Sequence, residues 1–457
     1  MKMKDYLALG ILCLFLVSCG GDKKEVAQEA SQGSGIESKV KHPQWSKDAV
    51  IYEVNIRQHT KEGTFNAFAK DIPRLKQMGI DILWLMPIHP IGEKNRKGSL
   101  GSYYAVKDYK GINPAFGTEN DFKNLVKVAH ENGLKVLIDW VANHTAWDHV
   151  WTKTNPEFYT KNDAGNFAPP VEDWEDVIDL DYSNDNLRAA MADALNYWVA
   201  EFDIDGYRCD VAGMVPTDFW NDVRKQLDQI KPVFMLAEGE ETELHEEAFD
   251  MTYSWELMHL MRKVASGEES PQAIKDMYAR DFKRYPEGYY KMNIITNHDE
   301  NSWNGTADEF FGAGQEAWFV FAATTYGMPL VYSGQEANNK KRIEFFEKDP
   351  IDWSGGYVFS PLYRALFQAK LQNPALWNGE FGGTLEWIKT TADDKILAFK
   401  RVKGERMVIT IINISDERVE FELDQDYLDM QRVFGGGALK VTKEQIIAPN
   451  RYKVFTK

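Results

Sequence analysis

Cysteine is scarce in this sequence of 457 residues. Only three cysteines are present, and Cys13 and Cys19 both lie near the N-terminus. The body of the chain keeps Cys209 alone and therefore cannot form an internal disulfide. Cys209 stands between Arg208 and Asp210, but neighbouring side chains in a strand point to opposite faces. We therefore expect Cys209 to pack in the core rather than to take part in chemistry.

Positive charge is also in short supply. Lysine and arginine total 53 against 70 aspartate and glutamate, which gives a formal net charge of -17. A chain with this charge would repel nucleic acid and anionic lipid, so we expect neither as a partner. A neutral ligand such as a carbohydrate is compatible with the charge, although the charge alone does not indicate one.

The N-terminal segment has the composition of an export signal. Lysines precede an apolar run over residues 6–17, which is too short for an ordinary membrane span. The sequence LVSC that ends at Cys19 resembles a bacterial lipoprotein signal, in which the cysteine is acylated. We therefore predict a lipoprotein signal peptide over residues 1–18 and a lipid anchor at Cys19. A plain signal with a chance cysteine is the alternative.

Residues 19–43 are rich in Gly, Ser, Gln, Glu and Lys and offer almost nothing to bury. Such a composition predicts a flexible tether. With an acylated Cys19, the tether would hold the folded body off a membrane without embedding it. We expect an exported, membrane-anchored lipoprotein, located in the periplasm or at the cell surface.

Apolar strands alternate with amphipathic helices through most of the chain. The strand over residues 82–88 has no polar face, and an apolar stripe from Phe65 to Met78 predicts a helix capped by Thr64 and ended by Gly79. The pattern predicts eight strands. The first ends near Asn55, and the other seven span residues 82–88, 135–139, 205–210, 234–238, 249–254, 293–299 and 329–334. Parallel strands covered by helices on this scale imply the α/β class and a (β/α)8 TIM barrel.

Two segments fall outside the alternation. Some forty residues follow the third strand where a barrel loop usually has a handful, so residues 140–183 should form a small inserted subdomain. The C-terminal part has strand patterns and no helical stripe, which predicts an antiparallel β-sandwich domain over residues 376–457. The barrel itself should comprise residues 44–139 and 184–375.

The stretch 203–214 carries the first chemical signal. Arg208 and Asp210 are two apart in a predicted strand and therefore share a face, where the guanidinium would keep the carboxylate ionised. Glu238 ends the next predicted strand, so the two acids should lie at the same ends of adjacent parallel strands. About 5 to 5.5 Å apart, they could cleave a glycosidic bond as nucleophile and acid. An ordinary ion pair plus a strand-end glutamate is the alternative.

Polar residues gather at the predicted ends of other strands as well. In a barrel these ends surround one mouth, so residues distant in sequence converge there. The residues concerned are Asp139, Asn143, His144, Arg208, Asp210, Glu238, Asn297, His298 and Asp299.

Four of these stretches resemble the signature regions of the α-amylase family of glycoside hydrolases. They are DWVANH from Asp139, GYRCD to Asp210, LAEGE around Glu238 and TNHD to Asp299, in the family's order. Three further stretches, at 102–118, 177–181 and 326–336, also look like family sequences. The resemblance covers the chain from about residue 45 onwards.

The resemblance implies a retaining mechanism on α-glucosidic bonds. Asp210 would be the nucleophile and Glu238 the acid that protonates the leaving oxygen and then activates water. Asp299 would hydrogen-bond the sugar hydroxyls, and the charges of Asp210 and Asp299 would raise the pKa of Glu238. By the same resemblance, Arg208 orients the nucleophile, His144 and His298 bind sugar hydroxyls, Tyr104 stacks under the sugar ring and Asp139 braces Arg208.

Many members of the family bind a structural calcium ion between the barrel and the insert, and the resemblance implies a calcium site here as well. The corresponding residues are Asn143 and Asp179, both oxygen donors suited to a hard cation. No organic cofactor is expected.

One departure from the family bears on specificity. Gly213 and Met214 stand where many α-amylases carry a Lys-His pair on the leaving-group side, which leaves room for short oligosaccharides or for transfer. Trp140, Trp147, Trp151, Trp174 and Trp303 could bind further glucose units or could pack in small cores. We therefore predict a hydrolase of α-glucans or maltooligosaccharides. A transglycosylase or isomerase with the same acids is one alternative, and a non-catalytic glycan-binding lipoprotein is another.

Overall fold

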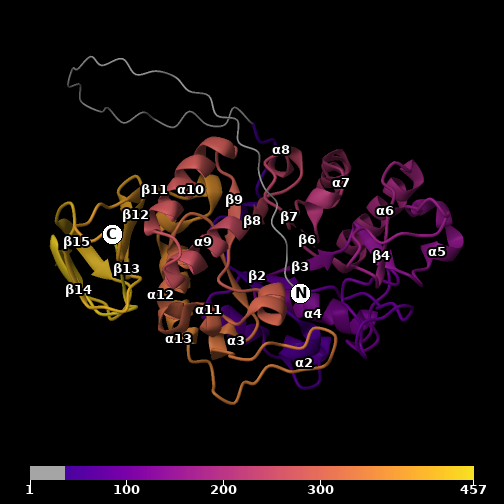
Figure 1. The fold of residues 1–457 in the computed structure, drawn as a ribbon, viewed down its shortest axis with the longest axis horizontal. Coiled ribbons are helices and arrows are strands. Elements are labelled where there is room, and N and C mark those ends of the chain that lie inside the picture. The colour runs from indigo at the N-terminus through magenta and orange to yellow at the C-terminus, as the bar shows by residue number, and fades with distance from the viewer. Residues whose placement is uncertain (1–36) are drawn as a thin grey trace. The chain divides into compact units, whose positions relative to one another are not determined.

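The computed structural model describes residues 37–457 (Figure 1). The predicted signal peptide, the anchor at Cys19 and most of the tether lie outside the described residues. The last part of the predicted tether lies against the folded body, because Lys39 N–H donates to the Glu246 carbonyl at 2.7 Å and His42 Nδ1 lies 2.9 Å from Asp250. Lys39 and His42 of the predicted tether therefore contact the folded body. None of the helices within residues 37–457 is long and apolar enough to cross a bilayer.

Eight parallel strands close into a barrel, as the sequence predicts. They follow one another around the barrel in chain order, with β1 beside β10. Their interior and exterior faces are buried, which explains their continuous apolar sequences. The strands are β1 (Ile51–Val54), β2 (Ile82–Leu85), β3 (Lys135–Trp140), β6 (Gly206–Cys209), β7 (Phe234–Ala237), β8 (Met251–Tyr253), β9 (Tyr290–Asn293) and β10 (Met328–Tyr332).

Helices connect these strands and bury their apolar stripes. In α4 (Glu119–Glu131), Thr118 and Asp121 form a capping box that satisfies the first backbone N–H groups. The other long helices are α6 (Asp185–Phe202), α7 (Thr217–Ile230), α9 (Trp255–Ser266), α10 (Pro271–Arg284), α12 (Gln315–Thr324) and α13 (Ser360–Gln372).

The helix predicted after Thr64 is two helices. Thr64 caps α2 (Phe65–Ala69), and a second helix, α3 (Ile72–Met78), ends at Gly79 with φ 101°. Pro73 stands in the first turn of α3, where its missing N–H costs nothing. In the interior of one longer helix, the same proline would break the hydrogen-bond pattern. The apolar stripe is continuous across the break, so the pattern alone did not reveal it.

The seventh strand lies earlier in the chain than predicted. The sequence places it at 293–299, whereas β9 ends at Asn293. The Asn293 amide turns away to donate to the Ala322 and Tyr326 carbonyls at 3.0 and 3.1 Å. Ile294 and Ile295 are buried without being in a strand, which accounts for the misleading apolar pattern. Residues 297–299 consequently follow the strand and lie at the barrel mouth.

The inserted segment and the C-terminal part add strands outside the barrel. After β3, the antiparallel pair β4 (His144–Ala146) and β5 (Val177–Asp179) flanks α5 (Trp151–Thr154). The C-terminal part (yellow in Figure 1) is antiparallel throughout. A six-stranded sheet contains β11 (Thr384–Trp387), β12 (Ile396–Lys403), β13 (Arg406–Asn413), β18 (Tyr452–Thr456), β15 (Tyr427–Arg432) and β16 (Ala438–Val441), and β14 (Val419–Glu422) pairs with β17 (Glu444–Ile447).

Candidate active site

A cleft of about 770 Å³ opens at the carboxyl ends of the barrel strands. Six of the residues predicted from the sequence line it together: Tyr104, His144, Asp210, Glu238, His298 and Asp299. Arg208 and Asp139 lie beneath them and are fully buried. The parallel strands thus bring together side chains that are far apart in the sequence, as expected for a barrel mouth.

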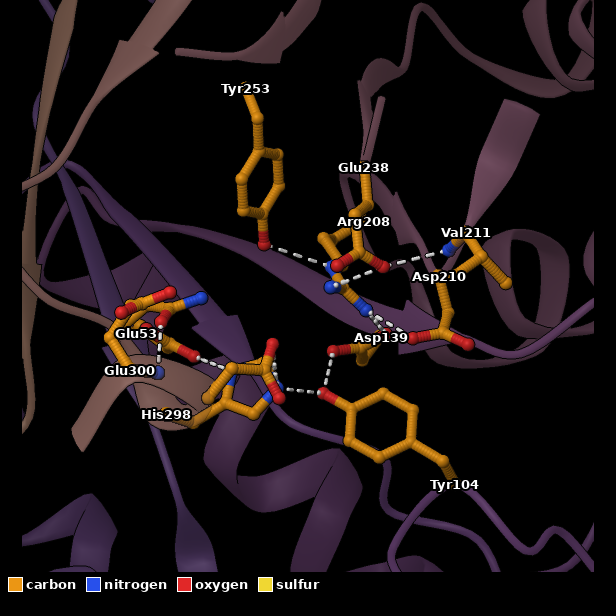
Figure 2. A network of polar contacts seen from close by, with 12 residues as sticks. Glu53, Tyr104, Asp139, Arg208, Asp210, Val211, Glu238, Tyr253, His298 and Glu300 are labelled. Carbon is orange, nitrogen blue, oxygen red and sulfur yellow. Dashed lines mark hydrogen bonds and ion pairs between the residues drawn. The ribbon is translucent and has the colours of Figure 1, made fainter. Parts of the chain in front are cut away.

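Arg208 is the centre of this group (Figure 2). Its Nη1 donates to Asp139 Oδ1 at 2.9 Å and to Asp210 Oδ1 at 2.8 Å, and its Nη2 lies 2.9 Å from Glu238 Oε2. Its Nε donates to the Tyr253 hydroxyl at 3.1 Å. Burial alone would lower the pKa of Arg208, but the surrounding carboxylates raise it well above its ordinary value. One permanent cation therefore touches three acids.

Strand packing brings Asp210 and Glu238 to the same guanidinium. Strands β6 and β7 are adjacent and parallel, with Cys209 opposite Ala237. Gly206 allows this close approach, because a Cβ there would lie 1.9 Å from the Phe234 carbonyl oxygen of β7. Cys209 itself is buried in the core, as expected.

Glu238 has the properties of a carboxyl that can hold a proton near neutral pH. Burial, followed by the charges of Asp210 and Asp299, raises its pKa to about 7, although Arg208 opposes the shift. The neighbouring charges are the cause expected from the sequence, whereas burial is the larger one. The Val211 backbone N–H donates to Glu238 Oε2 at 2.8 Å and fixes the direction of the carboxyl group.

Asp210 is buried as well, but its balance of charges differs. Burial raises its pKa to about 6, and Arg208 opposes this shift more directly than it does for Glu238, through a hydrogen bond. Burial raises the pKa of both groups, and the hydrogen bond from Arg208 favours the ionised form of Asp210 more than that of Glu238. Two carboxyl groups beside one guanidinium thus differ in how strongly they hold a proton, which is the direction that an acid and a nucleophile require.

A second group of polar residues surrounds His298. Its Nε2 lies 2.8 Å from the Tyr104 hydroxyl and 3.2 Å from Asp299 Oδ2, and the Tyr104 hydroxyl also contacts Asp139 at 3.0 Å. The rings of Tyr104 and His298 are nearly parallel, with centroids 5.5 Å apart. Partial burial would raise the pKa of Asp299, but His298 outweighs it and the pKa is lowered. Asp299 therefore remains a carboxylate.

His144 lies in a less polar part of the cleft. Burial lowers its pKa to about 3, so the ring is neutral at physiological pH. The Asn143 amide nitrogen lies 3.3 Å from His144 Nδ1. Because the Asn143 amide nitrogen is the donor, Nδ1 accepts and the ring proton is on Nε2. A hydrogen bond with the Tyr104 backbone partly offsets the effect of burial on the pKa. The Trp174 ring packs against His144 with centroids 5.3 Å apart.

Three contributors to the site escaped the sequence argument. Glu53 on β1 contacts His298, Tyr253 at the end of β8 contacts Arg208, and Val211 contacts Glu238 through its backbone. Glu53 left one signal, since it is the only charged residue in the apolar sequence IYEV. Val211 left none, because its role depends on a left-handed backbone with φ 36°, which is unusual for a β-branched residue.

The side chains of Asn143 and Asp179 already have partners within the protein. One oxygen of Asp179 accepts from the Thr160 hydroxyl at 2.6 Å, and the Asn143 amide nitrogen faces His144. Within residues 37–457, no group of three or more His, Cys, Asp or Glu side chains could hold a metal. Calcium binding at these two residues stays a prediction.

The five tryptophans considered as sugar-binding residues are in different environments. Trp174 and Trp303 line the cleft, and Trp303 is half exposed. Trp140 is fully buried in the core, and Trp147 and Trp151 do not line the cleft. Trp303 packs against Phe345, with centroids 5.2 Å apart, so it forms one wall together with the loop after β10.

The closed barrel with paired carboxyl groups at its mouth places this protein in the class of (β/α)8 enzymes. In that class, the active site lies at the carboxyl ends of the strands. The sequence model of the alpha amylase catalytic domain matches residues 29–168 and 171–350. The chain belongs to the α-amylase family of glycoside hydrolases.

Solved structures and curated proteins agree with this assignment. A maltogenic α-amylase from Thermotoga neapolitana is 33% identical, covers 90% of this chain and 99% of its own, and superposes with a TM-score of 0.82. An α-amylase of Haloarcula japonica is 25% identical over 422 residues, or 87% of this chain. A maltosyltransferase of Salinibacter ruber that acts with α-1,4-glucan and maltose 1-phosphate is 23% identical over 81% of this chain. This chain spans 60% of the length of each of these last two proteins.

Proposed function

We propose that the protein is a retaining glycoside hydrolase that cleaves α-glucosidic bonds in maltooligosaccharides or other short α-glucans. The observation that carries this proposal is the shared guanidinium of Arg208, which contacts Asp210 and Glu238 at once. The two acids approach one point from adjacent strands, and of the two only Asp210 accepts a hydrogen bond from the guanidinium, which favours its ionised form.

The reaction proceeds in two displacements. An Asp210 oxygen attacks the anomeric carbon while Glu238 donates its proton to the leaving glycosidic oxygen, so one C–O bond forms as another breaks. The departing sugar gains the proton, and a covalent glycosyl ester remains on Asp210. Glu238, now a carboxylate, takes a proton from water as the water oxygen attacks the same carbon. Asp210 is released, and the anomeric configuration is retained.

The other residues of the cleft hold the sugar during these steps. Asp299, ionised beside His298, accepts hydrogen bonds from the hydroxyls of the ring that is attacked. His144 donates from Nε2 to another hydroxyl, and the Tyr104 ring packs against the sugar face. Arg208 keeps Asp210 oriented, while Asp139 holds Arg208 from below. This division of roles follows the family resemblance, and the contacts of each residue are compatible with it.

Short substrates are favoured by the composition of the cleft rim. Gly213 and Met214 offer no charged side chain next to the nucleophile, and Met214 is half exposed. The walls carry Trp174 on the inserted segment and Trp303 beside Phe345, which limits the aromatic surface to a few sugar rings. The maltogenic α-amylase among the similar structures supports the same choice.

Transfer to a second sugar is the alternative that a specific observation favours. A covalent intermediate on Asp210 can be resolved by water or by a sugar hydroxyl, and a similar protein is a maltosyltransferase. An isomerase would resolve it in the same way. Product analysis on maltotriose to maltoheptaose separates these outcomes. Shorter products alone indicate hydrolysis, shorter products together with chains longer than the substrate indicate transfer, and an isomer of the same length indicates an isomerase.

A single substitution tests whether the protein is an enzyme of this type. Asp210→Asn keeps the size and the hydrogen bond to Arg208 but removes the nucleophile, so turnover should fall about 10⁴-fold or more. Unchanged glucan turnover in this variant would refute the mechanism. Binding of maltooligosaccharides without turnover in both the wild type and the variant would support a non-catalytic glycan-binding protein instead.

The location proposed for the enzyme is a membrane surface, reached through acylated Cys19 after removal of residues 1–18. The export-like composition of the N-terminal segment supports it. Expression of the full chain and of Cys19→Ala in a bacterial host with a labelled fatty acid tests this proposal. Label in the wild type alone supports an anchor, and label in neither refutes it.

A further inference from the structure

Glu53 is a buried acid that the proposed reaction does not use. It lies on β1 between Trp84 of β2 and Tyr332 of β10, and no part of it is exposed. An isolated ionised carboxylate in such a place is costly unless a partner compensates its charge. Within residues 37–457, the only side chain that hydrogen-bonds the Glu53 carboxyl group is His298, through Nδ1.

His298 therefore stands between two carboxylates. Glu53 contacts Nδ1 on one side of the ring, and Asp299 lies 3.2 Å from Nε2 on the other side, where the Tyr104 hydroxyl is also 2.8 Å away (Figure 2). A neutral imidazole carries a proton on only one nitrogen and could donate to only one of the two acids. The doubly protonated ring donates to both.

We infer that Glu53 is a positioning residue that keeps His298 charged, so that His298 in turn keeps Asp299 ionised and oriented for the substrate. This inference rests on the proposed function for the role of Asp299, and it adds a residue outside the four signature regions. It also explains why one acid occurs in an otherwise apolar strand.

The charged groups around His298 are consistent with this arrangement. Burial would lower the pKa of His298, but Asp299 and Glu53 outweigh it and the pKa is raised well above its ordinary value. Asp139 and Asp299 add negative charge on the cleft side, while Arg208 is the opposing cation. The titratable groups that face the Glu53–His298 pair are Tyr104, Asp139, Arg208, Tyr253, Asp299 and Tyr332.

The test measures the pKa of His298 directly. The protein contains nine histidines. With ¹³C-labelled imidazole, the His298 signal is identified as the one missing from His298→Asn. In the wild type we expect titration above the usual value of about 6.5, and in Glu53→Gln a decrease of about one to three pH units. A wild-type value at or below about 6.5, or an unchanged value in Glu53→Gln, would overturn the inference.

A matched control separates this effect from damage to the fold. Glu336 is equally buried and hydrogen-bonds the Tyr52 hydroxyl at 2.7 Å and Arg74 at 2.9 Å, without contacting His298. Glu336→Gln should leave the His298 titration unchanged. If Glu53→Gln does not fold, the titrations of the wild type and of Glu53→Asp still test the inference. Glu53→Asp keeps the charge and should therefore keep the pKa of His298 high.

Kinetics distinguish this inference from the proposed function. If the wild type cleaves α-glucans, Glu53→Gln should lose about tenfold in kcat/KM at neutral pH for each unit by which His298 falls below that pH. Activity in the wild type with an unchanged His298 titration in Glu53→Gln would refute the inference alone. Absence of any turnover in the wild type would refute the proposed function, while the titration would still test the contact.

Discussion

The cleft contains two cation-carboxylate clusters that differ in the nature of the cation. In the Arg208 cluster, a guanidinium contacts Asp139, Asp210 and Glu238. In the His298 cluster, an imidazole contacts Glu53 and Asp299. Arginine does not lose its proton in proteins, whereas histidine titrates near neutral pH unless its surroundings prevent it. The comparison teaches that the two acids proposed to react are held by a permanent charge. The acid proposed to bind sugar depends on a histidine whose charge, by our inference, the fold must maintain.

Between the two clusters, the larger effect should come from exchanging the permanent cation. Arg208→Lys keeps one positive charge, but an ammonium group cannot contact three carboxylates as the planar guanidinium does. Asp210 and Glu238 are then no longer held in a fixed orientation relative to each other. We expect kcat/KM to fall about 10³-fold. The unfolding free energy should fall by about 3 kcal/mol, because buried acids are left unpaired. Steady-state kinetics and denaturant unfolding measure both.

His298→Gln is the matching change in the other cluster. It leaves the Arg208 contacts intact, so the loss in activity should be smaller than for Arg208→Lys. An equal or larger loss would mean that the two clusters do not differ as described.

The pH dependence of the reaction should reflect the Arg208 cluster. The competent state has Asp210 ionised and Glu238 protonated. Activity therefore rises as pH increases through about 6, and falls as pH increases through about 7. We expect a narrow bell for kcat/KM with its maximum between these values. A profile that stays flat to about pH 9 would exclude Glu238 as the acid.

The sequence predicted much of this site because its signals are local. GYRCD places Arg208 and Asp210 on one face of a strand, and the continuous apolar strands predict a closed barrel in which Glu238 is a neighbour. The pKa of Glu238 required the structure, since burial, its main cause, is a property of the packed barrel. The predicted position of β9 was wrong because Ile294 and Ile295, which are buried in a loop, give the apolar pattern of a strand.

Contacts between distant segments could not be predicted from local sequence patterns. Glu53 and His298 are 245 residues apart, and nothing in either local pattern joins them. Val211 acts through a backbone N–H whose direction depends on a left-handed conformation that its residue type does not favour. The tryptophans illustrate the same point, because only the fold distinguishes buried Trp140 from Trp303 at the rim.

A smaller effect should follow from changes at the cleft walls, which touch neither cluster. Trp303→Ala and Trp174→Ala remove aromatic surface from opposite elements, so KM for maltooligosaccharides should rise about two- to tenfold with little change in kcat. Trp147→Ala, which alters a tryptophan outside the cleft lining, should leave KM unchanged. A drop in kcat without a change in KM would show that the walls contribute to the chemical step instead.

The smallest effect is expected from chelation. Both clusters hold their acids against Arg208 or His298, and the side chains of Asn143 and Asp179 already have partners within the protein. EDTA should therefore leave kcat within about twofold and Tm within about 2 °C of the untreated protein. A larger fall in Tm that calcium restores would show that these residues hold the ion after all.

The most direct test of the account is to trap the covalent intermediate. A fluorinated α-glucosyl fluoride that glycosylates the nucleophile but is released slowly should add one sugar to the protein. Peptide mass spectrometry should locate it on Asp210, and Asp210→Asn should remain unlabelled. A sugar attached to Asp299, Glu238 or another acid, or a reaction that inverts the anomeric configuration without any adduct, would contradict the assignment of Asp210 and Glu238 as nucleophile and acid.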